Sequence, residues 1–209
     1  MSVRGAVNRR IVILAEGDTE RAARNHIKRF VDGRAGNLPK VRLETSIFDG
    51  GLTEQEVRGR TTKFLSGDST LGVIALVDMY PQFKGLTPAR AKKIVRSWMP
   101  DDPRCHAHVA KHDFEAWLLH GWDALLKQSG VTGPRKRWSP SPEEVNHDNP
   151  PARRVRALFQ EGKPPRKYKK PVDGMKLFEK LDLAEVASVC PELKSFLDKL
   201  LQLCGYPLL

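Results

Sequence analysis

Hydrophobic residues in this chain form four short runs that are separated by amphipathic segments. Short runs rich in β-branched residues are typical of strands buried within a parallel sheet. They lie at residues 9–15, 41–48, 72–77 and 105–110. Helical periodicity follows each run, and we expect helices at 18–31, 53–66, 88–98 and 113–127. This alternation predicts an α/β fold, a layered sheet of about four mostly parallel strands flanked by helices.

The alternation ends near residue 128. Residues 129–151 contain five prolines and show no clear periodicity. A short helix is expected at 151–161, and apolar positions between 175 and 203 predict two or three further helices. We therefore expect an α/β core at 1–128. A basic loop and a helical C-terminal extension, 129–209, would pack on this core.

Carboxylates follow three of the apolar runs. Glu16 follows the first run, Asp78 the third, and Asp113 and Glu115 the fourth, while Glu20 lies four residues after Glu16. The ligand crevice of a parallel sheet lies outside the carboxyl ends of its strands, so these acids are expected to converge there. Converging carboxylates repel one another, and a divalent cation relieves that repulsion. The pattern predicts that all five acids bind Mg²⁺ or Mn²⁺.

Most of these acids also have a purely structural interpretation. Glu16 and Glu20 can complement the positive end of a helix dipole. Asp113 can cap the helix that follows it, and Glu115 suits a first turn. Asp78 has the weakest structural alternative, because no helix begins directly after it.

The histidines near the fourth run do not favour a zinc site. Cys105 and His106 would project to opposite faces of a strand, and no second Cys or His pair has ligand spacing. His112, beside Asp113, is a minor addition to the carboxylate site. The chain also has no P-loop, no G-x-G-x-x-G and no G-x-S-x-G, so nucleotide-loop and serine-hydrolase functions have no motif behind them.

The charge of the chain favours a polyanionic partner. The formal net charge is +11, and the isoelectric point is near 9.8. Residues 133–171 hold eleven Lys and Arg against four acids, a net +7. A solvated basic surface would also explain this segment, although Trp138, Phe159 and Tyr168 within it could offer faces for base stacking. The cations expected to hold a nucleic-acid backbone are Arg153, Arg154, Lys169 and Lys170.

Other features indicate a cytoplasmic protein. Three widely spaced cysteines, with no CxxC pair, are typical of reduced thiols. No apolar stretch approaches the roughly 20 residues of a membrane span, and no apolar region of a signal peptide follows the basic N-terminus. The sequence contains no signal for an oligomeric state.

Several short motifs resemble those of a known group of proteins. The segment 16–20, Glu-Gly-Asp-Thr-Glu after a strand, resembles the EGxTE signature of Toprim-like proteins. Asp78 together with the segment 112–119 resembles a bacterial family of unknown function within that set, which carries an HEFEA-like motif. Residues 151–154 and the Cys190-Pro191 pair resemble the tail of the same family.

The resemblance implies a Toprim fold, which also serves topoisomerases, bacterial primases and overcoming-lysogenization-defect nucleases. Glu16 would be the catalytic glutamate of the first strand, and Asp78 the first acid of a DxD motif. Tyr80 stands where the second aspartate belongs, so Asp113 or Glu115 would have to replace that ligand. The resemblance thus makes Glu16, Asp78 and Glu115 the catalytic candidates.

These observations favour a nuclease, or a related enzyme that processes phosphodiester bonds of DNA or RNA with one or two divalent metal ions. Two alternatives remain. The missing second aspartate suits a non-catalytic nucleic-acid-binding or partner module, such as a component of a defence-type system. A small-nucleotide phosphohydrolase would need the metal site but few of the cations.

Overall fold

The computed structural model describes residues 9–48, 51–138, 141–144 and 148–209. Within these ranges four strands form one sheet in which every neighbouring pair is parallel, in the order β2-β1-β3-β4. The strands are β1 (Arg10–Ala15), β2 (Arg42–Ile47), β3 (Thr70–Asp78) and β4 (Cys105–Ala110). The predicted α/β fold class is therefore confirmed.

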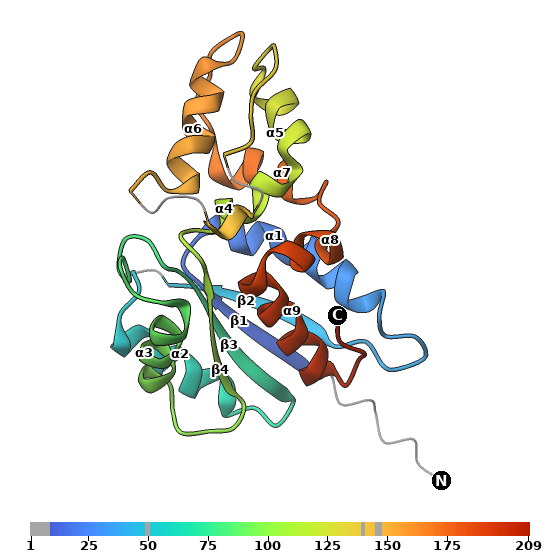
Figure 1. The fold of residues 1–209 in the computed structure, drawn as a ribbon. Coiled ribbons are helices and arrows are strands. Elements are labelled where there is room, and N and C mark those ends of the chain that lie inside the picture. Colours follow the sequence, from blue (N-terminus) through green and yellow to red (C-terminus); the bar gives the residue numbers. More distant parts are fainter. Residues whose placement is uncertain (1–8, 49–50, 139–140, 145–147) are drawn as a thin grey trace.

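Helices cover both faces of the sheet (Figure 1). One face packs against α1 (Asp18–Asp32) and α9 (Pro191–Cys204), the other against α2 (Glu54–Leu65) and α3 (Pro88–Trp98). Side chains along a strand alternate between the two faces. Accordingly, Ile11 and Ile13 of β1 join one buried cluster and Val12 and Leu14 the other. Burial on both faces explains why the strands have nearly continuous apolar runs.

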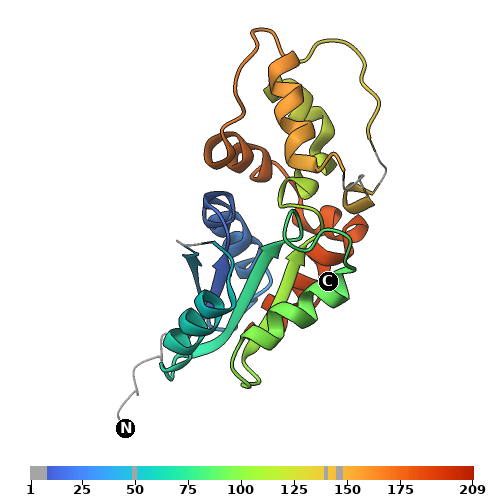
Figure 2. The ribbon, with the colours of Figure 1, turned by 90° about the vertical axis from the view of Figure 1, so that its left-hand side faces the viewer.

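A group of short helices, the helical lobe, lies beyond the carboxyl ends of the strands. The strands run toward this lobe in Figure 2. Its helices are α4 (Glu115–Leu118), α5 (Trp122–Ser129), α6 (Pro151–Glu161) and α7 (Met175–Phe178). A 3₁₀ turn (Leu119–Gly121) joins α4 to α5, a second (Pro142–Glu144) precedes α6, and a π-helical turn (Lys170–Gly174) leads into α7. From there α8 (Leu183–Val189) leads the chain back to α9 on the sheet.

The prediction of one continuous helix at 113–127 is wrong, because this segment consists of α4, a 3₁₀ turn and α5. The break falls at Gly121, whose ψ of 48° leaves the helical region. A Cβ at this position would lie 2.7 Å from Leu181 Cδ2, so a larger residue would have to displace the end of that side chain. Tertiary packing has overridden the local helical periodicity here.

Two further expectations concern the membrane and the thiols. No helix in the described ranges is long and apolar enough to cross a membrane. Cys105, Cys190 and Cys204 are buried and form no disulfide.

Candidate functional site

The centre of the sheet brings two of the predicted acids together. The chain passes from β1 outward to β2 and then crosses back over β1 to β3, so the direction of winding reverses between β1 and β3. Parallel sheets bind ligands outside the strand ends at such a switch point. Glu16 directly follows β1, and Asp78 is the last residue of β3. The Asp78 backbone N–H donates to Glu16 Oε1 at 3.0 Å, which ties the two residues together at this edge.

The loop after β4 orients Asp78 from the other side. The Phe114 backbone N–H donates to Asp78 Oδ1 at 2.9 Å. This loop turns sharply at His112, the one non-glycine residue with positive φ (72°) in the described chain. Such a conformation costs roughly 1 kcal/mol for a residue with a side chain. The His112 ring is buried and lies 3.2 Å, Nε2 to oxygen, from the carbonyl of Glu143, so it supports the turn.

Asp113 follows β4, and its side chain is 3% exposed and packs beside the first turn of α6. Its Oδ2 accepts a hydrogen bond from the Ala152 backbone N–H at 3.0 Å, in the first turn of that helix. Burial, and then the charge of Glu115, raise the pKa of Asp113 to about 7. The bond from Ala152 works in the opposite direction but does not outweigh them. Asp113 therefore joins the β4 edge to the helical lobe.

Glu115, the first residue of α4, is completely buried and faces residues 168–170 of the lobe. Its Oε1 accepts a hydrogen bond from the Tyr168 hydroxyl at 3.3 Å, and its Oε2 lies 3.0 Å from Lys170 Nζ. Burial and the Glu115 charge raise the pKa of the Tyr168 hydroxyl, which therefore stays a proton donor. A metal ion at Glu115 would have to compete with the Lys170 ammonium.

The five acids predicted as metal ligands thus divide into two pairs. In the described part of the chain, no group of three or more His, Cys, Asp or Glu residues is placed to share an ion. Glu16 and Asp78 lie at the switch point, whereas Asp113 contacts the first turn of α6 and Glu115, in α4, contacts Lys170. Glu20 belongs to α1, but its side chain is outside the described part. Because Mg²⁺ usually takes one or two carboxylates together with water and substrate phosphates, the donor set of Glu16 and Asp78 fits this ion.

One of the predicted cations contacts the loop that follows β3. Arg153 Nη2 donates to the Tyr80 hydroxyl at 3.2 Å, and its guanidinium lies 5.8 Å from the centre of the Tyr80 ring. Tyr80 itself is held by its backbone N–H, which donates to the His112 carbonyl at 2.6 Å. Arg153 is exposed, and its contact with Tyr80 places a positive charge on the loop two residues after Asp78.

The other three predicted cations have different surroundings. Arg154 donates from Nε to the Asn149 carbonyl at 2.8 Å and lies 5.3 Å from the centre of the Trp138 ring. Lys169 is exposed, and Lys170 forms the ion pair with Glu115. Of the aromatic residues expected to stack on bases, Phe159 and Tyr168 are in the core instead, because their rings pack on each other and on the lobe interior.

Glu143 is a buried acid that the sequence did not point to. It is 2% exposed, and its carboxylate accepts hydrogen bonds from Trp117 Nε1 at 2.9 Å and from the backbone N–H groups of Glu192 (3.0 Å) and Leu193 (3.2 Å). Burial raises its pKa despite these three donors. It connects α4 to the start of α9 and stabilises the fold. No sequence signal could have found it, since it lies in the proline-rich stretch without periodicity.

The fold and the site define a class: an α/β protein with an all-parallel sheet, a carboxylate pair at its switch point and a helical lobe over its strand ends. The chain belongs to the family described as a domain of unknown function, DUF4276, whose model matches residues 15–201. No curated protein and no solved structure matches the chain. The expected membership of a family of unknown function is confirmed, whereas the resemblance to Toprim proteins stays a prediction.

Proposed function

We propose that the protein is a divalent-metal-dependent enzyme that processes phosphodiester bonds of nucleic acid, in its simplest form a nuclease. The observation that carries the proposal is the position of Glu16 and Asp78. Two neighbouring central strands bring these acids to the switch point, where backbone N–H groups orient both carboxylates. The resemblance of the segment 16–20 to the Toprim signature supports the same assignment.

Glu16 and Asp78 would hold one Mg²⁺ or Mn²⁺, which when bound polarises a phosphate and lowers the pKa of a coordinated water. The chain supplies the positioning. The Asp78 and Phe114 backbone N–H groups hold the two carboxylates in place before substrate arrives. The Arg153 guanidinium, placed by Tyr80, would bind a non-bridging phosphate oxygen.

Tyr80 gives this proposal a specific form. A Toprim DxD motif would have a second aspartate here, but the Tyr80 hydroxyl accepts a hydrogen bond from Arg153 instead. The position therefore supports a cation rather than an anion. With Glu115 already paired with Lys170, this arrangement favours one metal ion and direct phosphate binding by arginine over a two-metal site.

The test is a cleavage assay on labelled single- and double-stranded DNA and RNA, with Mg²⁺, with Mn²⁺ and with EDTA. We expect metal-dependent products from the wild-type protein and at least about 100-fold slower turnover in Glu16→Gln and in Asp78→Asn, because mutating even the outer-shell partners of metal ligands typically costs about 10–100-fold and these two residues would be the ligands themselves. Glu54→Gln, an exposed acid in α2, is the matched control and should keep full activity. Full activity in Glu16→Gln would rule the mechanism out.

A second function is favoured by the same Tyr80 and by the ion pair of Glu115. If Tyr80 and Glu115 serve only to support the structure, the protein binds nucleic acid without cleaving it. A salt-sensitive mobility shift without products under every metal condition would establish that binding module. Displacement of the labelled polymer by a mononucleotide at equal phosphate concentration would instead indicate a small-nucleotide phosphohydrolase.

A further inference from the structure

A basic groove lies on the helical lobe, outside the carboxylate pair. Its volume is about 710 Å³, and it lies between α6 and the segment that leads into the π-helical turn. The side chains that determine its character are Arg156 and Gln160 of α6, together with Lys167, Lys169 and Lys170, with Tyr168 at its base. We call it the α6 groove.

Three of its cations have no acidic partner within the described residues. Arg156, Lys167 and Lys169 are exposed, and no described carboxylate lies within ion-pair distance of them. Other cations of the same lobe are paired: Arg135 lies 2.9 Å from Glu161, and Arg166 lies 2.9 Å from Asp173. A concave surface with several like charges and no counter-charge raises the local concentration of anions. The groove is thus the part of the lobe best suited to bind a polyanion.

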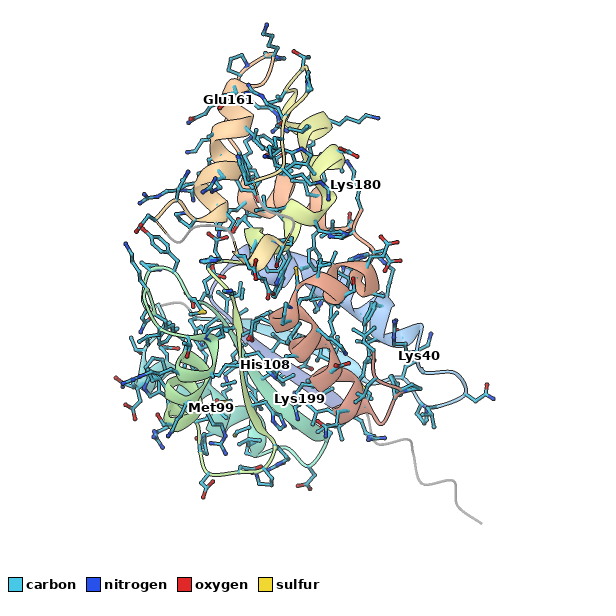
Figure 3. The ribbon with its side chains drawn as sticks, viewed as in Figure 1. Lys40, Met99, His108, Glu161, Lys180 and Lys199 are labelled. Carbon is cyan, nitrogen blue, oxygen red and sulfur yellow. The ribbon has the colours of Figure 1, made fainter. Side chains whose placement is uncertain are left out.

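Two residues that line the groove share a face of α6 with Arg153. Arg153, Arg156 and Gln160 are spaced by three and four residues, so they lie along one stripe of α6. This helix leads away from the strand ends, and Figure 3 labels Glu161 near its outer end. From Arg153 to Gln160 the stripe is roughly 10 Å long at 1.5 Å per residue. A stacked strand rises about 3.4 Å per nucleotide, so this length corresponds to about three nucleotides.

We infer that the α6 groove binds the sugar-phosphate backbone of a nucleic-acid strand, over about three nucleotides that lead away from the phosphate at Glu16 and Asp78. This inference rests on the proposed function for the position of the reacting phosphate. The inference adds to the proposed function that the substrate is a polynucleotide strand. A mononucleotide bound at Glu16 and Asp78 would contact Arg153 but would be too short to enter the groove. Tyr168 is 5% exposed and offers no open ring to a base. The groove therefore holds phosphates without reading sequence.

The test measures binding without catalysis. Fluorescein-labelled single-stranded DNA of 2, 4, 8 and 16 nucleotides is titrated with protein in EDTA, by fluorescence anisotropy at several salt concentrations. The groove variant carries Arg156→Gln, Lys167→Gln and Lys169→Gln. The control variant carries Lys127→Gln, Lys136→Gln and Arg137→Gln, which remove the same charge from exposed positions of the same lobe. Thermal melts of all three proteins check folding, and the three single groove variants replace the triple if it unfolds.

For the wild type we expect affinity to rise between 2 and 8 nucleotides and then to level off. The groove variant should bind the 16-mer at least tenfold more weakly. Its slope of log K against log salt concentration should be shallower by about 2, at roughly 0.7 for each lost phosphate contact. Each single variant should reduce the slope by about 0.7. The control should keep most of the wild-type affinity.

Equal loss in the groove and control variants would overturn the inference, and so would a wild-type affinity that does not depend on length. These results are separate from those of the cleavage assay. If the wild type forms no products but the groove variant loses binding, the proposed enzyme fails and the groove stands. If the wild type cleaves and the groove variant binds and cleaves normally, the groove assignment fails and the enzyme stands.

Discussion

Asp113 is the acid whose ionisation should limit the stability of this fold. It is 3% exposed, and burial together with the Glu115 charge raises its pKa from 3.8 to about 7. Because the folded pKa lies above the unfolded value, Asp113 binds its proton more tightly in the folded protein. Its favourable contribution is complete below pH 3.8 and is lost as the pH rises through about 7. Above neutral pH the ionised carboxyl destabilises the folded state.

The variant Asp113→Asn removes this titration and keeps the shape of the side chain. A difference of one pKa unit corresponds to about 1.4 kcal/mol, so ionisation of Asp113 at pH 8 costs about 4 kcal/mol. An asparagine Oδ1 can still accept the Ala152 N–H, although the bond to a carboxylate is stronger by about 1 kcal/mol. We therefore expect Asp113→Asn to raise the free energy of unfolding by about 2–4 kcal/mol at pH 8 and to have little effect near pH 4.

Urea unfolding between pH 4 and pH 8 measures this, with the fluorescence of the buried Trp117 and Trp122 as the signal. The informative quantity is the variant minus the wild type at each pH. His106 and His108 also titrate: burial lowers their pKa values to about 4 and about 3, so their contribution is lost as the pH falls below 6.5. That contribution is common to both proteins and cancels.

Asp123→Asn, an exposed acid in the first turn of α5, is the control and should give a difference near zero at every pH. The reasoning would be refuted if Asp113→Asn were less stable than the wild type at pH 8. It would equally be refuted if the difference between the two proteins did not change between pH 4 and pH 8.

Two further predictions concern other buried acids. Lys170→Met should lower the free energy of unfolding by about 2–3 kcal/mol, because it leaves Glu115 charged and unpaired. This figure is below the usual cost of breaking a buried pair because the Lys170 side chain is 35% exposed. Adding Glu115→Gln should restore at least half of the loss in urea unfolding, and no recovery would show that the pair is not the cause. Glu143→Ala should cost about 3 kcal/mol or more, since three donors lose their acceptor. A melting temperature within 2 °C of the wild type would contradict this estimate.

The convergence of Glu16 and Asp78 could be predicted from the sequence because it depends on where each buried strand ends and on few long-range contacts. A buried parallel strand has a recognisable apolar run, and the residue after that run must lie at the carboxyl edge of the sheet. No long-range information is needed beyond the pairing of β1 with β3. The helix from Pro88 to Trp98 was also predicted correctly, because a proline in the first turn is a local signal for the start of a helix.

The partners of Asp113 and Glu115 could not be predicted in this way. Glu115 meets Tyr168 across 53 positions of the sequence, and Asp113 meets Ala152 across 39. Neighbouring cations are equally hard to assign, because adjacent residues of a helix point about 100° apart. Arg153 therefore reaches Tyr80, while Arg154 turns to Trp138. Only the packing of α6 on the rest of the lobe decides which of the two faces the acids.

The helical lobe has opposite effects at the two halves of the strand edge. At β4 it supplies Tyr168 and Lys170, which contact Glu115, and the first turn of α6, which donates to Asp113 Oδ2. Among the described residues, no hydrogen-bond donor reaches the buried Asp113 Oδ1. At the end of β3 the lobe contributes the exposed guanidinium of Arg153, which contacts Tyr80, two residues after the half-buried Asp78. Asp113 and Glu115 are thus engaged by the lobe, whereas Glu16 and Asp78 lie together at the switch point. Under the proposed function, Glu16 and Asp78 would hold one metal ion and Arg153 would bind one phosphate, so that the position of Tyr80 would need no second aspartate.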